Sequence, residues 1–152
     1  MFTKVMFPLY ELCFKQNIFD SKCNDVLKYK SYLRKKTLKN SSLRGIVENH
    51  HIIPLQWKEH IVVKTIRYDP NKSYNLCILP NKKYPVKKDS CGKAIRIHEK
   101  GHIKYNSYVK EQLDVLLDDV DNEDLLKYKF WLFYIFLKTA LDNNESENID
   151  WN

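Results

Sequence analysis

All five histidines of the chain lie between His50 and His102, although about fifty residues flank this window on either side. His98 and His102 are four residues apart, so on a helix their rings project from one face, within reach of a single ion. In a strand, His50 and His51 point to opposite sides, so one of them can join that pair while the other faces a separate task. The spacing therefore predicts a three-histidine metal site with a fourth histidine beside it.

Such a site suits catalysis, because three neutral imidazoles leave a coordination position open, whereas structural zinc is usually closed by four protein ligands. An open metal ion can act as a Lewis acid on a phosphate oxygen. The remaining histidine, with an ordinary pKa of about 6.5, is mostly neutral at pH 7 and can take a proton from water. A cysteine metal site is not expected, because no Cys-x-x-Cys pair occurs, and we expect reduced, mostly packed thiols at Cys13, Cys23, Cys77 and Cys91.

The elements that must position these histidines are two short strands and a helix. Residues 76–79 read as one strand, and residues 52–55 as another that is short or at an edge, because Pro54 cannot donate to a central ladder. A helical pattern resumes from Ala94 and is expected to run through His98 and His102.

Further helices are expected on both sides of this core. The first fifty residues read as interrupted helix, with a break near residues 40–42 and a lysine-rich stretch between residues 28 and 39. Residues 130–137 are apolar and fall within a helix expected over about residues 124–141. Eight residues are far fewer than the roughly 20 needed to span a bilayer, so this run predicts core or a subunit contact and no membrane anchor.

Three blocks of the sequence resemble the HNH, or ββα-metal, endonuclease superfamily, and most closely its AHH-like branch. They are NHHIIPL at residues 49–55, NLCILP at residues 75–80 and HEKGHIKYNSYV at residues 98–109. The resemblance implies an α+β fold: a ββα-metal (His-Me finger) core with a short two-stranded antiparallel ribbon and a metal-bearing helix, embedded in additional helices. The chain departs from the branch signature at Asn49, which stands where the signature has alanine.

The resemblance also implies a role for each matching residue. His50, His98 and His102 would hold the metal, and His51 would be the general base. Asn75 occupies the position of the middle Asn, whose side chain helps to hold the loop that bears the base. Asn71 and Asn81 are neighbouring alternatives, but neither begins an Asn-x-x-x-Leu-Pro block.

Other polar residues near these blocks have two interpretations. Arg96, Lys100 and Lys104 lie close to the histidine pair in sequence and either reach phosphates or are merely solvated. His60 has no family counterpart, so it is expected to be structural, with a phosphate contact as the lesser alternative.

The charge distribution favours a polyanionic partner. The net charge is +7, but residues 1–110 hold 23 basic and 8 acidic side chains, whereas residues 111–152 hold 3 and 11. We expect a basic body that binds phosphates and an acidic segment turned away from it or masking it, although segregated helix surfaces would give the same pattern.

These observations predict a single nuclease domain over residues 1–152. It would comprise a helical N-terminal elaboration (1–45), the catalytic core (46–110), acidic and apolar C-terminal helices (111–141) and an acidic tail (142–152). The absence of a signal-peptide pattern predicts a cytoplasmic or nuclear, reducing location.

The expected activity is hydrolysis of phosphodiester bonds in DNA, or in RNA, with one divalent cation. Zinc or magnesium is expected first, and manganese or nickel would also fit. The expected partner is nucleic acid, chiefly double-stranded DNA, and no membrane association is expected. The sequence leaves open whether the protein forms a homodimer, and whether it binds an inhibitor protein if the enzyme is a toxin. The alternative is a zinc-stabilised nucleic-acid-binding module that cleaves nothing, which would have no use for a base at position 51.

Overall fold

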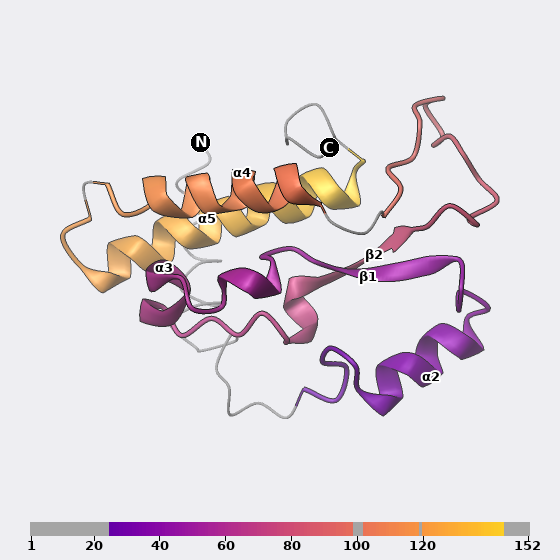
Figure 1. Cartoon of the computed structure of the whole chain (residues 1–152), viewed down its shortest axis with the longest axis horizontal. Helices are drawn as coiled ribbons and strands as arrows, with labels where there is room; N and C mark the ends of the chain where they lie inside the picture. Colours follow the sequence, from indigo (N-terminus) through magenta and orange to yellow (C-terminus); the bar gives the residue numbers. More distant parts are fainter. Residues whose placement is uncertain (1–24, 99–101, 119, 145–152) are drawn as a thin grey trace.

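The computed structural model describes residues 25–98, 102–118 and 120–144 (Figure 1). Expectations for residues 1–24 and 145–152 lie outside this part of the chain. The elements follow in the order α2 (Tyr32–Asn40), β1 (Val47–His51), the 3₁₀ helix η2 (Leu55–Trp57), α3 (Ile61–Thr65), η3 (Ser73–Asn75), β2 (Leu76–Pro80), α4 (Ile103–Val115) and α5 (Glu123–Asp142). This is an α+β fold with a two-stranded antiparallel sheet, as predicted.

The two strands run antiparallel, with a register that pairs Val47 with Pro80 and His51 with Leu76. The second strand falls where it was expected. The first was expected at residues 52–55, and this prediction is wrong, because β1 ends at His51. Ile52 and Ile53 are both fully buried, whereas successive residues of a half-buried strand alternate between its two faces.

A helix expected from Ala94 is also absent from the described part of that segment, since α4 begins at Ile103 and His102 is its N-cap residue. The backbone N–H groups before α4 are engaged elsewhere. The N–H of Ile95 donates to the carbonyl of Lys87 in the preceding loop at 3.0 Å, and that of His98 donates to the carbonyl of Pro80 at 2.7 Å. In a helix that began at Ala94, the N–H of His98 would instead donate to the carbonyl of Ala94.

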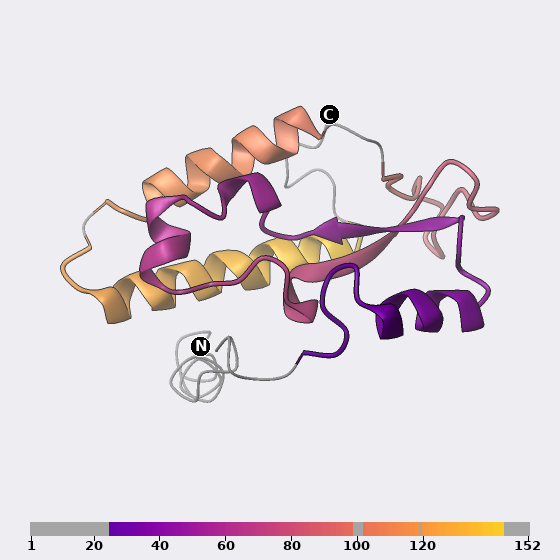
Figure 2. The same ribbon diagram turned by 60° about the horizontal axis from the view of Figure 1, so that its bottom comes forward.

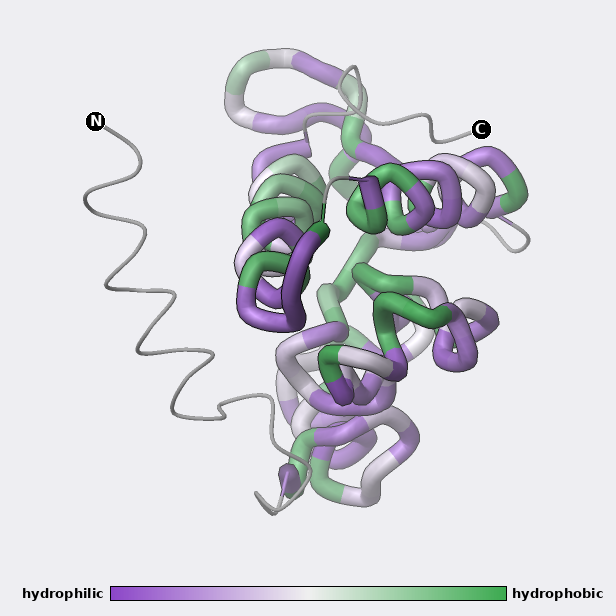
Figure 3. Tube along the Cα trace, turned by 90° about the vertical axis from the view of Figure 1, so that its left-hand side faces the viewer, coloured by the Kyte–Doolittle hydropathy of each residue, from purple (hydrophilic) through white to green (hydrophobic). Residues whose placement is uncertain are grey.

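The core lies between α5, α4, α3 and the sheet. Helix α5 was expected at about this position, and Asn122 caps it by accepting a hydrogen bond from the N–H of Leu125 at 2.9 Å. Helix α5 contacts α3 and β2. Figure 3 shows hydrophobic residues along α5 and through the middle of the molecule. The buried cluster draws on every one of these elements, through residues such as Ile52, Val63, Leu79, Val109, Phe130 and Leu137.

Two sequence expectations about apolar residues hold only in part. The apolar run at residues 130–137 was expected to lie in the core or at a subunit contact; most of it is buried or half-buried, but Leu132 and Phe136 are 37% and 40% exposed on one face of α5. Cys77 is buried, but Cys91 is exposed. Among the described residues, no helix combines the length and the apolar character that crossing a membrane requires.

Helix α2 lies on the opposite side of β1 from α4 (Figures 1 and 2). Ser31 caps its N-terminus by accepting a hydrogen bond from the N–H of Arg34 at 3.2 Å. None of its residues is buried. The predicted break after Asn40 is confirmed, because Ser42 and Gly45 have φ angles of 58° and 86°, which end the helix and turn the chain into β1.

Candidate active site and metal centre

Three histidines from separate parts of the chain converge on one point. His50 comes from β1, His98 from the extended segment after the β2 loop, and His102 from the N-cap of α4. One ligand nitrogen from each ring lies within 4.8 Å of the others. The Nε2 atoms of His98 and His102 are 3.0 Å apart. The convergence expected of these three residues is confirmed, although His98 reaches the site from outside the helix.

This arrangement fits a single divalent cation. Imidazole nitrogens bind zinc at about 2.0–2.1 Å, so ligand atoms on one ion lie within roughly 4 Å of one another. The His98 and His102 nitrogens already meet this limit, and the His50 nitrogen lies within 4.8 Å of both. A set of three neutral imidazoles leaves at least one coordination position for a substrate oxygen.

Glu48 is a functional residue that the sequence analysis missed. Its Oε2 lies 2.8 Å from Nδ1 of His98, so with the proton on Nδ1 the ring donates to the carboxylate. The lone pair of Nε2 then faces the other two histidines, the arrangement that carboxylates bonded to the far nitrogen of a ligating histidine produce. Strand alternation could have found this residue, because Glu48 and His50 are two apart and share one face of β1.

His50 is held in the neutral form that a ligand needs. It is 3% exposed, and its ring packs edge-on against Tyr105 at a centroid distance of 4.9 Å. Burial lowers the pKa of His50 well below 6.5, and positive charge on His98 or His102 would lower it further.

His51 points to the other face of β1, as the strand alternation predicted. Its ring contacts Tyr29 edge-on at 4.4 Å, and no residue in the described part of the chain hydrogen-bonds its Nε2. Burial lowers the pKa of His51, followed by the positive charges of Arg34, His98 and Lys30. This histidine is therefore neutral at pH 7, as a proton acceptor must be.

One cavity joins the two sets of histidines. It has a volume of about 330 Å³, and we call it the histidine cavity. Its walls include His51 and Tyr29 as well as the three converging histidines, His50, His98 and His102. His51 and the three converging histidines therefore face one shared space.

Asn75 lies behind the histidine cavity and fixes the chain that follows His51. It is fully buried, and its Oδ1 accepts from the N–H of Ile53 and from the hydroxyl of Tyr68, both at 2.7 Å. Its Nδ2 donates to the carbonyls of Ile53 at 2.9 Å and Pro70 at 2.8 Å. The amide thus uses both of its donors and two acceptor positions to hold the turn that follows His51.

The residues expected to contact phosphates lie in different settings. Arg96 is only 7% exposed, so its burial does not support a phosphate contact. Lys100 lies outside the described residues, and Lys104 is exposed in the first turn of α4. His60 is structural, because its Nδ1 accepts from the N–H of Val62 at 3.2 Å and its Nε2 lies 2.9 Å from Asp114.

Comparison with protein families gives a match over residues 31–129, to a nuclease family of the HNH/ENDO VII superfamily with a conserved AHH motif. The match covers all four histidines of the cavity and Asn75. The chain belongs to the AHH family. This membership assigns a nuclease function to the protein, and the two-stranded sheet with its helices agrees with a ββα-metal core of the HNH type. Comparisons with curated proteins and with solved structures find no match.

The departure from the AHH signature has a structural counterpart. Asn49 stands in the alanine position, and its Oδ1 accepts a hydrogen bond from Nε of Arg34 at 2.6 Å. An alanine could not make this bond. In this AHH protein the first signature residue therefore ties α2 to the strand that carries both adjacent histidines.

Proposed function

We propose that this AHH protein is a metal-dependent endonuclease that hydrolyses phosphodiester bonds in DNA, with His51 as the general base and one divalent cation bound by His50, His98 and His102. The observation that carries the proposal is the histidine cavity. It is lined both by His51, the candidate base, and by the cluster of three imidazoles. RNA is the alternative substrate of the same chemistry.

His51 acts as the proton acceptor. Its pKa is lowered by burial and by neighbouring positive charge, so the imidazole accepts a proton from an attacking water at neutral pH. Tyr29 packs against one edge of the ring, and Asn75 fixes the backbone of Ile53 two residues downstream. Fixing the base matters, because a displacement of about 1 Å can cost on the order of a hundredfold in rate.

The other three histidines of the cavity, His50, His98 and His102, bind the metal ion. Glu48 orients the His98 ring, and burial keeps His50 neutral, so the His50 nitrogen presents a lone pair without first losing a proton. When bound there, a divalent cation supplies the positive charge that neutralises the scissile phosphate and stabilises the leaving oxygen. Zinc, magnesium, manganese and nickel are the ions to be tested.

The test uses a covalently closed supercoiled plasmid, which has no ends and reports endonuclease cleavage alone. The purified chain is incubated with Mg²⁺, Mn²⁺, Zn²⁺ or Ni²⁺, beside the variant His51→Ala. We expect nicking by the wild type with at least one ion and a loss of about 100-fold or more in the variant. Normal activity of His51→Ala would refute its role as the base. A parallel assay on single-stranded RNA decides between the two substrates.

The matched control is His60→Ala, because His60 is a described histidine that does not line the histidine cavity. We expect nicking per folded molecule to stay within about twofold of the wild type, since His60 caps α3 and its ring hydrogen-bonds to Val62 and Asp114, which do not line the cavity. Metal binding by the wild type without nicking under any of the four ions would instead favour the non-catalytic binding module.

A further inference from the structure

The segment that precedes β1 carries unusually concentrated positive charge. Residues 26–47 contain seven lysines and arginines and no aspartate or glutamate. Helix α2 has no buried residue, so its side chains add little to the core. Within the described part of the chain, its three lysines form no ion pair, whereas lysines of α3, α4 and α5 do. The charge on α2 is therefore open to an external anion.

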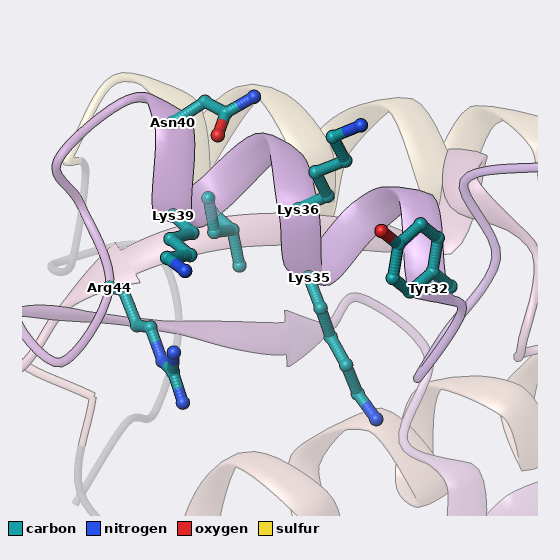
Figure 4. Close-up of a pocket in the computed structure, with 7 residues that line it drawn as sticks. Tyr32, Lys35, Lys36, Lys39, Asn40 and Arg44 are labelled. Carbon is teal, nitrogen blue, oxygen red and sulfur yellow. The ribbon is translucent and has the colours of Figure 1, made fainter.

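These side chains line a hollow, which we call the α2 groove, with a volume of about 480 Å³. Figure 4 shows that Lys35, Lys39 and Arg44 extend from α2 and the turn after it in one direction, while Lys36 extends the other way. Lys35 and Lys39 are four residues apart, which places their Cβ atoms about 5–6 Å from each other on one helix face. Three cations thus share one side of the groove.

The α2 groove is fastened to the same face of β1 as His51. Arg34 of α2 donates from Nε to Oδ1 of Asn49 at 2.6 Å. Asn49 and His51 are two residues apart in β1 and so project from one face of the strand. Tyr29, just before α2, contacts the ring of His51. Asn49 and Tyr29 also line the histidine cavity, so α2 is linked to the cavity through the strand residue that Arg34 contacts and through the chain just before the helix.

We propose that the α2 groove binds the sugar-phosphate backbone of the nucleic-acid substrate, at phosphates that flank the one placed beside His51. This inference rests on the proposed nuclease function and adds the surface that holds the rest of the strand. Lysine and arginine contacts to phosphates give sequence-independent affinity and fix the register of the substrate on the protein. The groove would therefore position the scissile bond without reading bases.

The test is the triple variant Lys35→Ala, Lys39→Ala, Arg44→Ala in the full chain. Alanine favours helix, so α2 should persist, and circular dichroism checks this. Binding to a fluorescein-labelled 30-base-pair DNA duplex is measured by anisotropy in chelator-containing buffer, where no metal-dependent cleavage can occur. We expect affinity to fall on the order of tenfold or more at about 0.1 M salt, and the slope of log K against log salt to become shallower by about 3.

The matched control removes three other exposed lysines, as Lys64→Ala, Lys110→Ala, Lys138→Ala. Each of these is held in an ion pair with an acidic neighbour, and the change in net charge is the same. We expect its affinity to stay within about threefold of the wild type. Equal losses in the two triple variants would overturn the proposal, because net charge alone would then explain the binding, and so would unchanged affinity in the groove variant.

A second measurement separates this inference from the proposed function. Bis(4-nitrophenyl) phosphate is a phosphodiester with no flanking phosphates, so its metal-dependent hydrolysis tests the histidine cavity alone. We expect the groove variant to hydrolyse it at the wild-type rate while its KM for plasmid rises. Loss of this hydrolysis in the groove variant would contradict a role confined to backbone binding. If the wild type cleaves neither substrate, the proposed function fails, and the anisotropy comparison still decides whether the groove binds DNA.

Discussion

The side chain of Asn75 hydrogen-bonds to both backbone polar groups of Ile53, accepting from its N–H at 2.7 Å and donating to its carbonyl at 2.9 Å. This pair of bonds replaces the ladder partners that Ile53 would have if β1 continued. The strand therefore ends at His51, and the chain turns into the core with Ile52 and Ile53 both buried. A single amide from η3 thus decides where the strand that carries two cavity histidines stops.

Replacing Asn75 should destabilise the fold and disable the site together. In Asn75→Ala the buried N–H and carbonyl of Ile53 lose the amide that bonds to them, and Tyr68 loses one hydrogen bond from its hydroxyl. We expect the free energy of unfolding, measured by urea denaturation, to fall by on the order of 3 kcal/mol. Cleavage per folded molecule should also fall, because the turn after His51 is no longer held.

Asn81→Ala is the matched control for this prediction. The Asn81 amide donates to the carbonyl of Gly45 at 3.0 Å in an exposed setting, so its loss should cost about 1 kcal/mol or less. Similar stability losses in both variants would show that Asn75 is not the central Asn of this site.

Glu48 should act on metal binding through His98. In Glu48→Gln the charge is removed while a hydrogen-bond acceptor is kept, and we expect metal affinity to weaken about tenfold, with a larger loss in Glu48→Ala. Titration of the metal-free protein with Zn²⁺, followed by calorimetry, measures this directly. Glu59→Gln is the control, since Glu59 is an exposed partner of Lys64, and it should leave the affinity unchanged. An unaltered affinity in both Glu48 variants would remove the carboxylate from the site.

Removing one metal-binding histidine should reduce the stabilisation that the metal ion gives to the folded protein. With metal at about 100 times its Kd, binding stabilises the folded state by about 2.7 kcal/mol, which corresponds to a rise in Tm on the order of 5–10 °C. A chelator should reverse this rise in the wild type. In His98→Ala the rise should shrink or vanish, because one of three imidazoles is lost. Thermal denaturation with and without the ion measures the effect, and unchanged metal stoichiometry in the variant would exclude His98 as a ligand.

The sequence located the site residues better than it located the elements that carry them. The four-residue spacing of His98 and His102 was interpreted as one helical face, but His98 lies outside the helix. Its N–H donates to the carbonyl of Pro80, and its ring is held by Glu48. The two rings still meet, because the end of β2 and the start of α4 come together in the fold. Periodicity cannot report such bonds, since their partners are far away in the sequence.

The sequence by itself determined much of the site's composition: the clustered histidines, the strand near residues 76–79 and the long apolar helix are readable from residue type and local pattern, and the family resemblance added the middle Asn and the antiparallel ribbon. Only the tertiary structure decided that nitrogens of His50 and His98 lie within 4.8 Å of each other, that Glu48 hydrogen-bonds to His98, and that Arg34 reaches Asn49 to fasten α2 beside His51. The physical reason is distance along the chain. Local preferences act over a few residues, whereas these contacts join residues 15 to 50 positions apart and form only when the core brings their elements together.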